Sequence, residues 1–314
     1  RAVIEELVNV NRYPESGCHY LTVDLAEYHG LEQGQIFVGN GSNEIIELLV
    51  RAFVRPDENV MYPYPSFIAY PLIIHQAGVG EIKVPLDGYT LDLSAMKKAV
   101  NSKTKMVFIC TPNNPTATYV PEADIVDFLE GIRQDIIIVF DEAYYEYVTA
   151  GDYPASTSLL ERFENIVILR TFSKVHSLSG VRIGYAMAAT DLVTILHMVR
   201  QPFNVNRLAQ AAARAAIKFS GDLADRIAEN NSERERLTQQ IRSMGMDVPE
   251  SQTNFLLAVP KGGESDIVDK LMDLGIIVRS GAPWGLGKES FRVSIGTPAE
   301  NDRFLEGLRQ VLSR

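Results

Sequence analysis

The sequence predicts an α/β protein with a large domain, in which helices flank a mostly parallel β-sheet, and a smaller α+β C-terminal domain. In the first part of the chain, short runs that are apolar almost throughout alternate with segments of helical periodicity. Such runs are typical of parallel strands that are buried on both faces of a sheet. After about Asn204 the pattern changes to two long helices and then to a strand–helix–strand–strand–helix order. With 314 residues, of which 46% are hydrophobic, the chain is long enough for two domains.

Seven apolar runs are expected to form the strands of the large sheet. They occupy residues 35–40, 59–65, 80–86, 105–112, 135–145, 165–174 and 181–188. Helices are expected between them, for example over residues 42–53, 122–134 and 191–201, where apolar residues recur three and four positions apart. Polar residues follow directly on several of the strands, and the carboxyl ends of such strands are where α/β sheets bind ligands.

The second part of the chain begins with helical patterns over residues 207–220 and 225–245, the latter carrying a charged, solvated face. We expect the large domain to span residues 16–245 and the small domain residues 246–314. The opening segment, residues 1–10, resembles the middle of an amphipathic helix, so we expect chain upstream of it and interpret residues 1–15 as the remnant of an N-terminal arm or helix.

Composition excludes several classes of function. A formal net charge of −10 argues against non-specific binding to nucleic acids and to anionic membranes. Any phosphate or carboxylate ligand must therefore be bound by a few placed arginines and backbone amides. The two cysteines, Cys18 and Cys110, make a disulfide framework implausible and favour the reducing cytosol. No apolar run reaches the length of a membrane span, and no signal peptide is visible.

The segment GNGSNEII, residues 39–46, places glycines before Ser42 and Asn43 at the start of a helix. Backbone amides and the helix dipole at such a position suit a phosphate. An ordinary helix N-cap after a glycine turn explains the pattern equally well. The segment lacks the Gly-Lys-Ser/Thr ending of a P-loop, so nucleotide hydrolysis is disfavoured.

Two further strand ends carry polar side chains. Asn113 and Asn114 follow one buried strand, either as a simple turn before Pro115 or with an amide directed into a cleft. Asp141 and Glu142 end another, where a carboxylate is costly without a cationic or hydrogen-bonding partner. The five histidines are scattered and show no metal-ligand spacing, so no metal site is expected. The paired carboxylates of a glycosidase remain an alternative for this segment.

The segment TFSK places Lys174 at a further strand end, eight residues before Arg182. A lysine among apolar neighbours and near a second cation has a lowered pKa and can act as the nucleophilic amine of a Schiff base. It can also simply pair with an acid, whereas a Ser-x-x-Lys nucleophile has little support because Thr171 occupies the serine position. The glycine turn that follows is expected to let the chain double back. Together these signals fit one ligand, pyridoxal phosphate.

The order GNGSNE, YPSF, TPNNPT, DEAY, TFSK and GVRIGY resembles the pyridoxal-phosphate-dependent aminotransferases of fold type I along essentially the whole chain. Within that family it is most similar to the histidinol-phosphate aminotransferases. The resemblance implies that Lys174 binds the cofactor covalently and then transfers the substrate proton, and that Asp141 pairs with the pyridinium nitrogen. It also implies that Asn114 and Tyr144 donate to the phenolic oxygen of the cofactor and that Phe67 stacks on its ring. The residues that match the phosphate cup are Ser42, Asn43, Thr171, Ser173 and Arg182.

Two implications of the resemblance concern partners. Tyr13 matches a tyrosine that reaches the cofactor phosphate of the other subunit, which implies a homodimer with shared sites. Arg279 and Arg292 match arginines that bind the substrate phosphate. Arg292 alone would also suit a carboxylate, so Arg279 is the residue that favours a phosphorylated substrate.

The expected reaction is therefore the exchange of the amino group of histidinol phosphate with 2-oxoglutarate, which yields imidazole acetol phosphate and glutamate in histidine biosynthesis. An aromatic amino acid aminotransferase and a pyridoxal-phosphate-dependent phospho-amino-acid decarboxylase are the alternatives, and a cofactor-sensing regulator is disfavoured. The sequence departs from the family at Ala117, where glycine is usual and a left-handed turn would cost about 1 kcal/mol, and at Arg207, where a small residue is common. For His176 we expect no role beyond packing.

Overall fold

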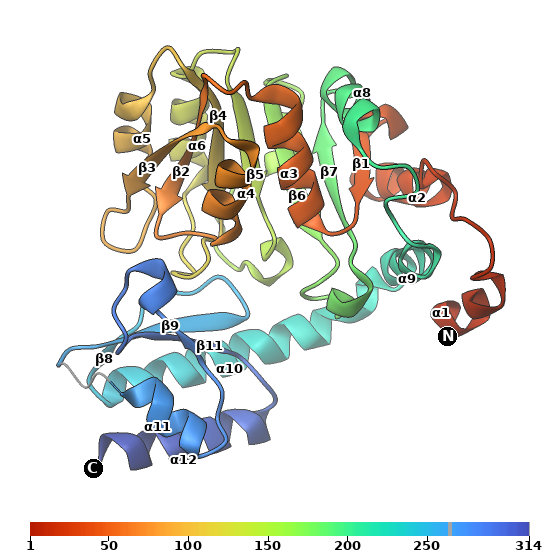
Figure 1. Cartoon of the computed structure of the whole chain (residues 1–314). Helices are drawn as coiled ribbons and strands as arrows, with labels where there is room; N and C mark the ends of the chain where they lie inside the picture. The colour runs from red at the N-terminus through yellow and green to blue at the C-terminus, as the bar shows by residue number, and fades with distance from the viewer. Residues whose placement is uncertain (263–265, 314) are drawn as a thin grey trace.

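The computed structural model describes residues 1–262 and 266–313, and it contains two β-sheets (Figure 1). The larger sheet has seven strands in the order β1-β7-β6-β5-β4-β2-β3. The strands are β1 (Ile36–Gly39), β2 (Asn59–Tyr64), β3 (Gly80–Pro85), β4 (Thr104–Cys110), β5 (Ile137–Asp141), β6 (Ile166–Thr171) and β7 (Gly184–Ala188). Each falls within a run expected to be a strand, except that β4 begins one residue earlier, so the predicted α/β class is confirmed. The pairs from β3 across to β6 are parallel, and β7 runs antiparallel to both of its neighbours, β6 and β1.

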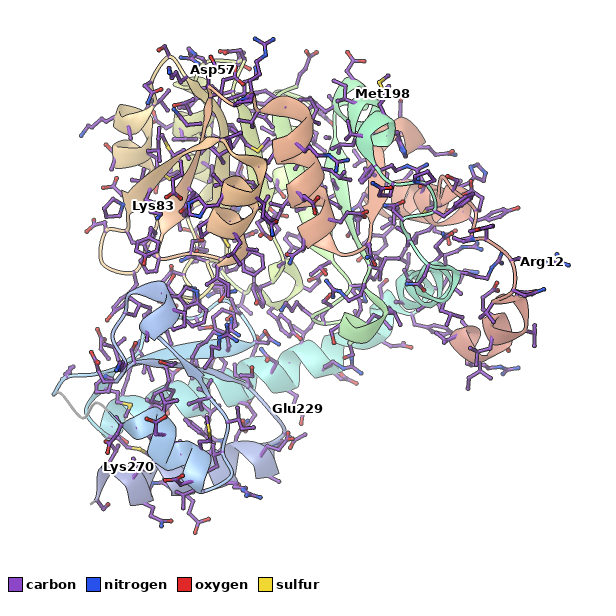
Figure 2. The ribbon with its side chains drawn as sticks, viewed as in Figure 1. Arg12, Asp57, Lys83, Met198, Glu229 and Lys270 are labelled. Carbon is purple, nitrogen blue, oxygen red and sulfur yellow. The ribbon has the colours of Figure 1, made fainter. Side chains whose placement is uncertain are left out.

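Both faces of the large sheet are buried. In β5, Ile138 and Phe140 contribute to one apolar layer, whereas Ile137 and Val139 contribute to the other. Side chains alternate between the faces of a strand, so a strand buried on both faces must be apolar at every position. Side chains fill the space between the sheet and the helices (Figure 2).

Helices cover the two faces unequally. The first layer packs against α2 (His19–His29), α5 (Leu93–Ala99), α6 (Glu122–Glu130), α7 (Ser156–Leu159) and α9 (Arg207–Lys218). The second layer packs against α3 (Ser42–Phe53), α4 (Ala69–Ala77) and α8 (Thr190–Val199). In α3 the apolar residues Ile45, Ile46 and Leu49 lie on one stripe, which is the reason that this segment forms a helix on the sheet.

The second sheet is antiparallel, in the order β10-β11-β9-β8. Its strands are β8 (Met246–Asp247), β9 (Phe255–Pro260), β10 (Arg279–Ser280) and β11 (Phe291–Ser294). They share an apolar core with the long helix α10 (Ala224–Ser243) and with α11 (Ile267–Asp273) and α12 (Pro298–Leu312). Leu237 and Ile241, near the end of α10, already belong to this core. The division into domains at residues 245 and 246 stays a prediction.

The N-terminal segment is less helical than its pattern indicates. Helix α1 covers only Ala2–Glu6 and continues as a 3₁₀ turn over Leu7–Asn9. None of these residues is buried, so the segment lacks the packing that sustains an amphipathic helix. Arg207 holds it in place, because its guanidinium lies 2.6 Å from Glu6 Oε1 and donates a 2.9 Å hydrogen bond to the carbonyl of Tyr13. The unusual arginine thus has a structural role on α9.

Ala117 has the left-handed backbone that its position predicts, with φ of 65°. Its N–H donates a 2.7 Å hydrogen bond to the carbonyl of Asn113, and its carbonyl accepts one of 2.9 Å from the amide of Gln252. Its methyl group is fully buried against Tyr144 and Val175. Burying a methyl group contributes about 0.8 kcal/mol, which offsets much of the conformational cost of alanine in this turn.

Cys18 and Cys110 are both buried free thiols, and the cytoplasmic location that they suggested stays a prediction. Across residues 1–262 and 266–313, none of the helices combines the length and the apolar character that crossing a membrane requires.

Candidate active site

A cleft of about 360 Å³ lies where the carboxyl ends of β4, β5 and β6 meet the second sheet. In Figure 1 the second sheet lies beyond this edge of the large sheet. Twelve of the thirteen residues proposed from the sequence line this cleft. They are Ser42, Asn43, Phe67, Asn114, Asp141, Tyr144, Thr171, Ser173, Lys174, Arg182, Arg279 and Arg292. Parallel strands bring their carboxyl ends to one edge, which is why segments far apart in sequence meet here.

Lys174 follows β6 and carries its amine over the ring of Tyr144, 4.9 Å from the ring centroid. Burial lowers the pKa of Lys174, Arg292 and Arg182 lower it further, and Asp141 acts in the opposite direction. A larger fraction of neutral amine is therefore present near pH 7 than for an exposed lysine, as a nucleophile or base requires.

The turn after Lys174 does not use glycine in the way that the sequence indicated. Gly180 has no positive φ, whereas Ser177 and Arg182 do, with φ of 57° and 59°. The amide of Ser177 donates to the carbonyl of Lys174 at 2.9 Å, and that of Leu178 to the carbonyl of Phe172 at 3.0 Å. The chain doubles back as expected, but through two strained non-glycine residues next to the cleft.

Asp141 is the last residue of β5 and is 4% exposed. Its Oδ2 accepts a 2.8 Å hydrogen bond from the hydroxyl of Tyr70, and its Oδ1 is buried without a partner in the described part of the chain. Burial raises the pKa of Asp141, while the hydroxyl of Tyr70, the backbone amide of Ala143 and the charge of Lys174 oppose the rise. An unpaired buried carboxylate oxygen is costly, and the protonated nitrogen of a pyridine ring would supply the missing partner.

An anion-binding nest lies at the start of α3. The residue before the helix, Gly41, has φ of 84° and no side chain to cap the first amides, those of Ser42 and Asn43. A Cβ at Gly41 would lie 2.5 Å from Arg182 Nη2, so glycine lets the guanidinium come close to the helix N-terminus. Exposed amides, a helix dipole and an arginine together fit the phosphate of pyridoxal phosphate.

Asn114 and Tyr144 each keep a group that can donate a hydrogen bond. Arg292 Nη1 donates a 2.6 Å hydrogen bond to Asn114 Oδ1, so the amide NH₂ is the part of Asn114 left to donate. Burial raises the pKa of the Tyr144 hydroxyl well above its usual range, so it stays protonated. Its ring packs edge-on against Phe255 at 5.0 Å. These two donors, Asp141 and the nest satisfy the requirements of the cofactor.

Glu142 does not line the cleft. It is fully buried and pairs with Arg170, whose Nε and Nη2 lie 3.1 and 3.0 Å from its Oε2. The guanidinium of Arg170 also stacks on the ring of Tyr145, 3.3 Å from the centroid. Glu142 is therefore committed to a structural ion pair, which removes the support for a glycosidase with paired carboxylates.

Tyr13 and His176 also lie outside the cleft. Tyr13 is 78% exposed and stacks on Phe203 at 4.7 Å, away from the site of its own chain. Its proposed role at a partner's site stays a prediction. His176 lies under Phe172 and 4.0 Å from Glu146, and burial lowers its pKa to about 4. The histidine is therefore neutral near pH 7, in keeping with packing.

Sequence reasoning missed some residues of this region. Cys110 pairs in register with Asp141 and lines the cleft, as do Ile68, Ala143, Ser179 and Trp284. Tyr70, the partner of Asp141, lies on α4, where only the tertiary fold brings it to β5. One feature of the sequence could have drawn attention to Trp284, namely that it is the only tryptophan in the chain.

Known proteins resemble this chain over nearly its whole length. The family model for aminotransferase class I and II matches residues 2–308. A histidinol-phosphate aminotransferase of Desulfotalea psychrophila is 38% identical over 99% of this chain and 83% of its own, and one of Brevibacillus brevis is 38% identical over 99% and 85%. The solved structure of histidinol-phosphate aminotransferase from Sinorhizobium meliloti in complex with pyridoxal-5'-phosphate has a TM-score of 0.92 at 26% identity, covering 99% of this chain and 86% of that one.

These likenesses agree with the site. The nest at α3, the unpaired oxygen of Asp141 and the amine of Lys174 all lie in the region that the family model matches. The enzymes of this family exchange amino groups with the help of pyridoxal phosphate. The chain belongs to the aminotransferases of class I and II.

Proposed function

We propose that this aminotransferase transfers the amino group of histidinol phosphate to 2-oxoglutarate, in histidine biosynthesis. One observation carries the choice of substrate: Arg279 and Arg292 are direct partners across β10 and β11 at the cleft. Among the described residues, neither guanidinium has a carboxylate within ion-pair distance. Two adjacent cations without an acidic partner suit a dianionic phosphate better than a single carboxylate. The names of the relatives support the same choice.

The residues of the cleft have distinct roles in this proposal. Arg182 and the first amides of α3 would hold the cofactor phosphate, and Phe67 would stack on the ring. Asp141 would keep a proton on the ring nitrogen, while Asn114 and Tyr144 would donate to the phenolic oxygen. When bound, pyridoxal phosphate supplies an aldehyde that accepts the amino group and a ring that withdraws electrons. Lys174 Nζ, whose lowered pKa favours the neutral amine, would take the proton from Cα of the substrate.

Replacing Arg279 with alanine is expected to lower kcat/KM for histidinol phosphate by roughly 10- to 100-fold, since a hydrogen bond to a charged group contributes about 1.5–3 kcal/mol. Turnover of phenylalanine and the half-reaction with glutamate should change little. Steady-state kinetics with each substrate on the cofactor-loaded enzyme measures the difference. Arg55→Ala, an exposed arginine outside the cleft, is the control.

The same substrate panel separates the alternatives. A preference for phenylalanine over histidinol phosphate in the unmodified enzyme would favour an aromatic aminotransferase. Release of carbon dioxide without dependence on a 2-oxo acid would favour a decarboxylase. Equal losses of kcat/KM for histidinol phosphate and phenylalanine in Arg279→Ala would show that Arg279 does not select the phosphate.

We further propose a homodimer in which Tyr13 reaches the cofactor phosphate of the partner. What supports this is the exposed ring of Tyr13 on a segment that Arg207 fixes outside its own cleft. Mixing the inactive variant Lys174→Ala with Tyr13→Ala should form hybrids in which one site has both residues intact. Recovery of activity on mixing is expected, with sedimentation to measure the mass. A monomeric active enzyme would exclude the proposal.

A further inference from the structure

The two arginines proposed to bind the substrate are neighbours despite the repulsion between their charges. Arg279 and Arg292 lie directly opposite each other in the β10–β11 pair. Like charges at such positions destabilise a sheet. Burial lowers the pKa of Arg292, and the charge of Arg279 lowers it further. Without a ligand, something else must keep both guanidinium groups at the cleft.

The two side chains are held very differently. Arg292 is partly buried, donates to Asn114 Oδ1 at 2.6 Å and lies over the ring of Phe255, 4.8 Å from its centroid. Arg279 is exposed, and among the side-chain hydrogen bonds, ion pairs and ring contacts of the described residues its guanidinium has one, with the ring of Trp284, 5.8 Å from the centroid. Arg292 would therefore keep its place without the tryptophan, whereas Arg279 would not.

Trp284 is held firmly enough to serve as a platform. It ends the 3₁₀ turn Ala282–Trp284, is 3% exposed, and its amide donates a 2.9 Å hydrogen bond to the carbonyl of Gly281. That glycine is anchored in turn to the carbonyl of Ser290 at 2.8 Å, beside β11. The ring also lies 5.4 Å from the guanidinium of Arg292, so it faces both cations and lines the cleft.

The choice of tryptophan at this position has a cost. Its indole N–H is buried and has no partner among the residues that the structure describes. An unpaired buried donor destabilises a protein by about 1–3 kcal/mol, and phenylalanine would fill an apolar space without it. What tryptophan supplies beyond phenylalanine is the strongest attraction of any side-chain ring for a cation.

We propose that Trp284 is a positioning residue that holds Arg279 over the cleft and thereby gives the site its preference for a phosphate dianion over a carboxylate. The inference rests on the proposed function, in that the phosphate is taken to belong to the amino substrate. It adds a residue that acts through Arg279, not through contact with the reacting atoms.

The test compares Trp284→Leu, which removes the aromatic face, with Trp284→Phe, which keeps a weaker one. The leucine variant should lose roughly twofold to fivefold in kcat/KM for histidinol phosphate, mostly through KM, and the phenylalanine variant less than about twofold. Turnover of phenylalanine should change less than twofold in both. The double variant Trp284→Leu, Arg279→Ala should be no worse than Arg279→Ala alone, because both changes remove the same interaction.

A binding measurement supplies a readout that does not depend on turnover. The cofactor is fixed to Lys174 with borohydride, and inorganic phosphate is titrated by calorimetry. Its affinity should fall roughly tenfold in Arg279→Ala, roughly twofold to fivefold in Trp284→Leu, and less in Trp284→Phe. In the unmodified protein the fluorescence of its one tryptophan should change with the same titration.

The outcomes separate this inference from the proposed function. If the unmodified enzyme does not convert histidinol phosphate, the proposed function fails, and the phosphate titration still decides the role of Trp284. If the enzyme does convert histidinol phosphate, but Trp284→Leu lowers kcat/KM equally for histidinol phosphate and phenylalanine, or for neither, Trp284 is merely structural and the inference is wrong. Additive losses in the double variant would overturn it as well.

Discussion

Replacement of Lys174 by alanine is expected to lower kcat for transamination by at least about 10⁴-fold, because it would remove the proposed covalent anchor and the proposed general base at once. The amine lies at the end of β6, over the ring of Tyr144, and its lowered pKa suits both tasks. No other lysine lines the cleft among the described residues. Following the cofactor absorbance on mixing with glutamate measures the half-reaction directly.

Two controls make the lysine experiment decisive. Lys98→Ala removes an exposed lysine of α5 and should leave the half-reaction unchanged. Free methylamine added to Lys174→Ala should restore part of the proton transfer, since an external amine can enter the vacated space. A Lys174→Ala enzyme that retains more than about one hundredth of the original rate would contradict the assignment.

Asp141→Asn is expected to lower kcat by about 10²- to 10³-fold, the loss typical of removing one preorganised electrostatic group. The neutral amide keeps the shape of the side chain but cannot hold a proton on the ring nitrogen. Steady-state rates and the position of the cofactor absorbance band both report the change. Asp57→Asn, at the opposite end of the large sheet from the second sheet (Figure 2), is the matched control.

Stability distinguishes this effect from misfolding. Asp141 Oδ1 is a buried carboxylate oxygen without a partner, so the cofactor-free protein should not be destabilised by Asp141→Asn. Thermal unfolding without cofactor measures this. A variant that loses both activity and several degrees of Tm would instead indicate that Asp141 supports the fold through Tyr70.

The parts of the fold that were predicted from sequence are those whose signals are local. The apolar run before Asp141 and the periodic pattern of Ser42–Phe53 suffice for a strand and a helix. Polar residues at strand ends then indicate the edge that holds the site. The antiparallel direction of β7 had no local signal, because it depends on which edge of the sheet the strand joins.

The details that were missed depend on tertiary contacts. Tyr70 becomes a partner of Asp141 only when α4 packs on the sheet, and Trp284 meets Arg279 only when β10 and β11 pair. The left-handed residues after Lys174 are Ser177 and Arg182 in place of a glycine, since surrounding bonds hold a conformation that local preference disfavours. Residues 1–10 form less helix than their periodicity suggests, because none of Ala2–Asn9 is fully buried.

The arrangement of the site along the chain has a consequence for its synthesis. The residues proposed to hold the cofactor within one subunit lie between Ser42 and Arg182, in the large-sheet part of the chain. Arg279 and Arg292 come from the second sheet, and Trp284 from the turn between β10 and β11. Domains fold as units from the N-terminal end as the chain leaves the ribosome. The large sheet and its helices through α9 emerge before either substrate arginine has been translated. A nascent chain of this enzyme would therefore complete the residues proposed to retain its cofactor before the residues proposed to choose a substrate.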